Sequence, residues 1–141
     1  MTQTDTPVTD LRAQIDQMEE AYEFLISFAG RGIGRESVQS DTGKVGEYVA
    51  EFETGVADGF AAARAVPEVH DEFDTAAYRS FLDTMEGEVE EARTVVDLLA
   101  EQEVITSALV DNMNGMSVFQ SVMMKFFFLD ELTDHLERGD A

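Results

Sequence analysis

Several stretches of this chain place apolar residues at alternating steps of four and three. In the N-terminal segment the series is Leu11, Ile15, Met18, Tyr22, Leu25 and Ala29. A comparable series runs from Tyr78 to Leu99. On an α-helix this spacing places every member on one stripe, because about 3.6 residues complete a turn. The intervening positions are rich in acidic residues, as on a solvent-exposed face. The sequence therefore predicts amphipathic helices that bury their stripes against one another.

The predicted helices occupy four segments of the chain, approximately 10–29, 41–66, 74–101 and 116–137. Four amphipathic helices with short connections indicate one all-α domain over residues 1–141, folded as an antiparallel up-and-down four-helix bundle. The segment 104–113 has a helical pattern but is followed by the turn-forming pair Asn114-Gly115. It is either a short additional helix or a loop.

Capping and helix-breaking residues set the expected ends of these helices. Thr9 and Asp74 are suited to cap the first and third helices, and Pro67 predicts that the second helix ends at Val66. Within the second helix Gly55 and Gly59 lie one turn apart, although each glycine costs a helix up to about 1 kcal/mol relative to alanine. We expect a neighbouring helix to pack closely against this pair.

The charge of the chain excludes several kinds of partner. Thirty acidic residues against nine basic ones give a formal net charge of -21. Nucleic acids and anionic membranes are unsuitable partners, because both attract positively charged surfaces. The composition resembles that of cytosolic proteins from salt-in halophilic archaea, where molar salt screens such self-repulsion. No stretch approaches the length of about 20 apolar residues that a membrane span needs, so we expect a cytoplasmic location.

Chemistry-bearing residues are sparse. The chain has no cysteine and only two histidines, so the Glu-x-x-His pairs of ferritin-like di-metal bundles are missing. Glu131 and His135 lie one helical turn apart and are weak candidates for a metal site, since two ligands hold a metal poorly. No serine lies beside a histidine in sequence, and no nucleophile-elbow motif occurs. We expect no cofactor and no catalytic residue.

The glycine-rich stretch FAGRGIGRES joins the first two predicted helices and supplies much of the local basic charge. It lacks the preceding strand and the spacing of a phosphate-binding loop, so its glycines most simply allow a reversal of the chain. Arg31, Arg35 and Lys44 are the basic residues in and after this turn. They either pair with nearby acids and a helix C-terminus or bind an anion or an acidic partner.

The last predicted helix has more apolar residues than one stripe can hold. Val122, Phe126 and Leu129 share one face, whereas Met124 and Phe128 lie on a different arc. Either this helix is enclosed on several sides or one of its faces meets a partner. The candidate interface residues are Met116, Met123, Met124, Phe127 and Phe128.

These observations favour a non-enzymatic protein that acts by protein association. We expect a homodimer that serves as an adaptor or regulator, with another protein as a further partner. Two alternatives stay open at this point. One is a bundle that binds a small ligand or a metal, with a ferritin-like oxidoreductase as its extreme form. The other is an anion sensor that works through Arg31 and Arg35.

Overall fold

The computed structural model describes residues 7–30 and 35–137, with side chains at 7–30 and 44–136. This part of the chain is helical and contains no strand. Its elements are α1 (Pro7–Gly30), α2 (Arg35–Val69), the 3₁₀ turn η1 (Asp71–Phe73), α3 (Ala76–Ala100), α4 (Ser107–Asn114) and α5 (Ser117–Glu137). The all-α class predicted from the spacing of apolar residues is confirmed.

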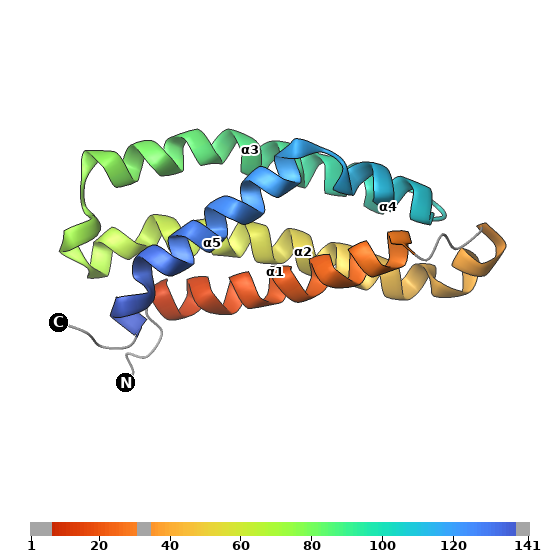
Figure 1. Ribbon diagram of the computed structural model, residues 1–141, viewed down its shortest axis with the longest axis horizontal. Helices are drawn as coiled ribbons and strands as arrows, with labels where there is room; N and C mark the ends of the chain where they lie inside the picture. Colours follow the sequence, from red (N-terminus) through yellow and green to blue (C-terminus); the bar gives the residue numbers. More distant parts are fainter. Residues whose placement is uncertain (1–6, 31–34, 138–141) are drawn as a thin grey trace.

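The long helices run back and forth along one axis of the molecule (Figure 1). Helices α1, α2 and α3 alternate in direction, and α5 returns to the end at which α1 begins. The segment that the sequence left as helix or loop folds as α4, with the Thr106 hydroxyl accepting a hydrogen bond from the Leu109 backbone N–H at 3.2 Å. The short helix α4 therefore precedes α5 as a separate element.

The predicted starts of the first three helices are wrong. The largest difference is in the second helix, since α2 begins at Arg35 and not near residue 41. Helix α1 begins at Pro7, because a proline in the first turn has no N–H to leave unpaired, so Thr9 lies inside the helix. Helix α3 is capped by Thr75, whose hydroxyl accepts a hydrogen bond from the Tyr78 backbone N–H at 3.1 Å. The neighbouring Asp74 carboxylate instead pairs with Arg79.

The predicted end of the second helix at Val66 is also wrong, since α2 continues through Pro67 to Val69. Proline has no N–H to donate to the carbonyl four residues earlier, which belongs to Ala63. The Tyr78 hydroxyl donates to this carbonyl at 2.7 Å and so replaces the missing bond. Burial raises the pKa of Tyr78 to about 12, so the hydroxyl keeps its proton. A tertiary contact from α3 thus stabilises the last turn of α2.

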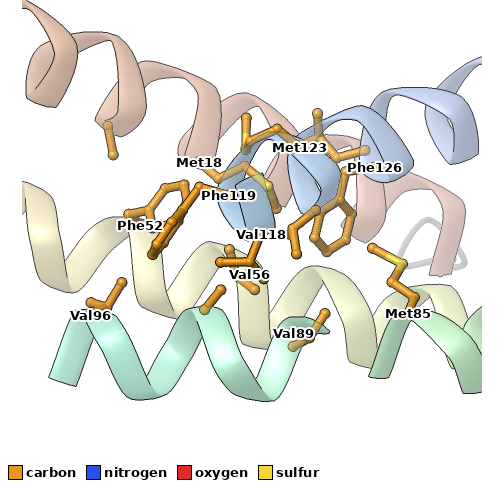
Figure 2. Packing of buried hydrophobic residues seen from close by; sticks show 14 of the residues in the cluster. Met18, Phe52, Val56, Met85, Val89, Val96, Val118, Phe119, Met123 and Phe126 are labelled. Carbon is orange, nitrogen blue, oxygen red and sulfur yellow. The ribbon is translucent and has the colours of Figure 1, made fainter. Parts of the chain in front are cut away.

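The core lies between the apolar stripes of all five helices. Its largest fully buried side chains include four phenylalanines: Phe28, Phe52, Phe119 and Phe126. Figure 2 shows Phe52 beside Phe119, with Val56, Val118 and Phe126 in the same layer. The centroids of the Phe52 and Phe119 rings are 6.0 Å apart, so side chains of α2 and α5 meet in the middle of the core.

Helices α1 and α2 approach each other closely at two glycines of α2. A Cβ atom at Gly55 would lie 3.2 Å from Cβ of Met18 and 3.3 Å from the carbonyl oxygen of Gln14. At Gly59 it would lie 3.2 Å from both Met18 Cε and Phe126 Cε1. The expectation of a close neighbour at this pair is confirmed. The helix propensity lost at these glycines is offset by tight contact with α1.

We expect Gly55→Ala to lower the free energy of unfolding by about 1–3 kcal/mol, because the added methyl group meets rigid helix atoms of α1. The matched change is Gly46→Ala on the same helix, where an added Cβ meets nothing within 4 Å. This control should gain about 0.5–1 kcal/mol from helix propensity. Urea denaturation followed by circular dichroism compares the two. Equal stabilisation by both changes would contradict the close packing.

Candidate interaction surface on α3 and α5

Helix α5 exposes three large apolar side chains on the arc opposite its buried stripe. Met124 is 64% exposed, Phe128 is 53% exposed and Leu132 is 37% exposed, whereas Val122, Phe126 and Leu129 are fully buried. The Phe128 ring contacts the Phe81 ring of α3, with the centroids 5.5 Å apart. The two arcs inferred from the sequence are therefore present, and the second arc borders α3.

The five residues expected at an interface do not form one surface. Met123 is buried in the core, and Phe127 is half-buried against it, so neither offers a free apolar face. Met116 is exposed but lines a different hollow, beside α4. Only Met124 and Phe128 lie together. The sequence alone does not separate the exposed residues from the buried ones, because their exposure depends on which side of α5 faces the core.

Two shallow hollows flank Phe128. One, of about 350 Å³, lies between η1, α3 and α5. It is lined by Glu72, Phe73, Thr75, Ala77, Tyr78, Phe81, Phe128 and Leu132. The second, of about 310 Å³, is lined by Phe81, Ser121, Met124, Lys125 and Phe128. Since both hollows are lined by Phe81 and Phe128, they adjoin each other along the line where α3 meets α5.

The side of α3 next to this seam is almost free of charge. At steps of three and four, its exposed residues are Ala77, Ser80, Thr84, Gly87, Glu91, Thr94 and Leu98. Glu91 is the single acid among them. The other exposed flank of α3 is charged and faces α2, where Asp83 and Glu86 bind Arg64. We define the α3–α5 surface as Ala77, Ser80, Phe81, Thr84, Gly87, Met124, Phe128 and Leu132.

A polar network closes one end of this surface. The Lys125 ammonium donates to the Glu88 carboxylate at 2.6 Å and to the Ser121 hydroxyl at 2.8 Å. The Ser121 hydroxyl in turn donates to Glu88 at 2.9 Å. Burial alone would raise the pKa of Glu88, but hydrogen bonds from Lys125 and Ser121 outweigh it, so the pKa is lowered. The spacing of four residues could have revealed the Ser121–Lys125 pair; the Glu88 partner comes from another helix.

This network ties α3 to α5. Ser121 and Lys125 lie one turn apart on α5, and both donate to the Glu88 carboxylate of α3.

The weak metal candidates Glu131 and His135 both lie on α5, and His135 also contacts an acid of η1. The His135 ring nitrogen Nε2 lies 3.1 Å from the Glu72 carboxylate of η1, and Glu131 does not share this contact. Within the described residues, no group of three histidine or acidic side chains is placed to hold a metal ion. The His135–Glu72 pair instead links the C-terminal part of α5 to the turn before α3.

The basic turn lies mostly outside the described part of the chain. The side chains of Arg31 and Arg35 are not among the described residues. Lys44 is described: its ammonium nitrogen lies 5.7 Å from the centroid of the Phe24 ring on α1. The same ring stacks on Tyr48 at 4.1 Å. Lys44 thus contributes a cation–π contact between α1 and α2.

Comparison with known proteins finds no match: no family model, no curated protein and no solved structure is similar to this chain. Among the described helices, none combines the length and the apolar character needed to cross a membrane.

The Glu88 network makes stability depend on pH in a defined direction. Because the folded-state pKa of Glu88 is lowered, its stabilisation is present above the ordinary carboxyl pKa of 4.5 and is lost as the pH falls through the folded value. Glu88→Gln should therefore be less stable by about 1 kcal/mol at pH 7, with the difference from wild type shrinking below pH 4.5.

Urea denaturation at stepped pH values measures this difference. Glu90→Gln, an exposed change on the same helix, is the control and should track the wild type. A deficit in Glu88→Gln that stays constant from neutral to acid pH would contradict the assigned role of the carboxylate.

Proposed function

We propose that the protein functions by association with a second copy of itself through the α3–α5 surface, as a non-enzymatic adaptor or regulator. The observation that carries this proposal is the exposure of Met124 and Phe128 beside a neutral flank of α3, on a chain with a net charge of -21. Burying such side chains against a partner stabilises the complex.

The shape of the surface supports self-association. A two-fold dimer requires one patch to be complementary to itself. The α3–α5 surface combines large exposed side chains at Met124 and Phe128 with small exposed residues at Ser80, Thr84 and Gly87. Around a two-fold axis, the large side chains of each copy can pack on the small residues of the other.

The distribution of charge supports the same partner. Two chains of -21 repel each other wherever acidic faces meet. The charged flank of α3, with Asp83 and Glu86, points toward α2 and away from the proposed contact. Molar salt shortens the screening length to about 3 Å, so a high-salt cytoplasm suits the assembly.

The proposal includes an arrangement of the helices within each copy. We propose that α4 and α5 together act as the fourth member of an up-and-down bundle with α1, α2 and α3. In support, the ion pairs of Arg12 with Asp130 and Asp134 join α1 to α5. This pairing keeps one side of α5 engaged inside the chain and leaves the arc of Met124 and Phe128 for the partner.

Phe128→Gln should weaken the dimer by about tenfold to a hundredfold, because a half-exposed aromatic ring at the centre of an interface is a typical hot spot. Light scattering across a dilution series in about 2 M KCl should show the wild type with the mass of two chains and the variant shifting to one. Circular dichroism checks that the variant is still helical.

Ile26→Gln is the matched control, since Ile26 is also an exposed apolar residue but lies on α1. It should leave the mass unchanged. A wild type with the mass of one chain at all concentrations, or a dimer indifferent to Phe128→Gln, would refute this interface.

A further inference from the structure

A second apolar hollow lies between the C-terminal part of α3 and α4. It has a volume of about 200 Å³, and we call it the α3–α4 pocket. Its lining residues are Val95, Leu98, Leu99, Gln102, Leu109, Asn112, Met113 and Met116. Leu98 is 56% exposed, and Leu109 and Met116 are also exposed. The interior is thus apolar, and its edge is open to a partner.

The pocket is separate from the α3–α5 surface. Leu98 lies 17 residues beyond Phe81 on α3, which corresponds to about 25 Å at 1.5 Å per residue. The polar network of Glu88, Ser121 and Lys125 lies between the two apolar regions. An occupant of the pocket therefore need not compete with a copy bound at Met124 and Phe128.

The polar groups around the pocket present hydrogen-bond acceptors. Gln102 uses its side-chain nitrogen to donate to the Leu98 carbonyl at 2.9 Å. Asn112 does the same to the Ala108 carbonyl at 2.8 Å. Each amide nitrogen uses one of its two hydrogens in these bonds, so the amide oxygen and the second N–H stay available to a partner. The amide oxygens are acceptors that a cationic side chain can use.

The surroundings of the pocket are negatively charged. Glu101 and Glu103 are exposed and flank Gln102, which lines the pocket. The C-terminus of α3, at Ala100, adds the negative end of a helix dipole. Arg93, the described basic residue nearest in α3, is directed to Glu53 of α2, with Nε 3.6 Å from the carboxylate. The rim thus favours a cation.

We propose that the α3–α4 pocket binds the apolar side chains of a cationic amphipathic helix from another protein. The apolar interior with methionines at positions 113 and 116 adapts to leucine-like or phenylalanine-like anchors. The acidic rim and the amide oxygens match lysine and arginine on either side of such anchors. A second copy of this chain is unsuitable here, because it would bring Glu101 and Glu103 against the same acids.

The probe is a fluorescent synthetic peptide of about 18 residues with leucine on one helical face and lysine on the other. A comparison peptide has the same lysines but serine in place of leucine. Fluorescence anisotropy in about 0.15 M KCl measures both dissociation constants. We expect the leucine peptide to bind at least about tenfold more tightly, because the serine peptide retains only the charge attraction.

The protein variants test where the peptide binds. The double variant Leu98→Gln/Leu109→Gln should weaken binding of the leucine peptide by at least about tenfold. Val69→Gln changes a comparably exposed apolar residue near the end of α2 and should leave binding unchanged. Equal binding of the two peptides, or a double variant that binds like wild type, would overturn the proposal in favour of general charge attraction.

Two measurements separate this inference from the proposed dimer. The native mass of the double variant should equal that of wild type; a shift toward the mass of one chain would show that a second copy covers the pocket, and would overturn the proposal. The leucine peptide should also bind Phe128→Gln as tightly as wild type. Loss of peptide binding in this variant would place the site at the α3–α5 surface and likewise overturn it.

Discussion

The apolar stripes bring the helices of this strongly acidic chain together, and several of its few cations lie where those helices meet. Arg12 joins α1 to α5, Arg64 and Arg93 join α2 to α3, and Lys125 joins α3 to α5. Each is at a seam, where two acidic helix flanks would otherwise repel. At Glu53 the nearby cation does not fully offset the burial of the carboxylate. Burial, and then the neighbouring Asp97 carboxyl, raise the pKa of Glu53 although Arg93 acts to lower it.

The contact of α1 with α2 relies on shape as well as on charge. Gly55 lets the backbone of α2 approach Met18, and Gly59 leaves room for both Met18 and the Phe126 ring of α5. The same small residue therefore fixes two contacts, one between α1 and α2 and one with α5. Since this packing holds the Phe126 side of α5 in the core, Phe128 on the opposite arc faces outward.

The sequence predicted most of the helices because their apolar stripes are periodic, and it predicted the role of Gly55 because glycine in a helix needs compensation. The sequence-based prediction failed where a residue far away in the sequence determines the local structure. Pro67 is tolerated in α2 because the Tyr78 hydroxyl reaches the carbonyl that proline leaves free. Met123 and Met124 are adjacent in sequence, and only the packing of α5 buries one and exposes the other.

The two apolar regions of the surface differ mainly in their charge, and this difference assigns them different proposed partners. The region around Phe128 borders a neutral flank, so a like-charged chain can approach it. The α3–α4 pocket lies next to Glu101 and Glu103, so a like-charged chain is repelled and a cationic helix is attracted. Raising the salt concentration should therefore strengthen the first association and weaken the electrostatic part of the second. Self-association through Phe128 and binding of a cationic helix at the α3–α4 pocket should therefore respond to salt in opposite directions.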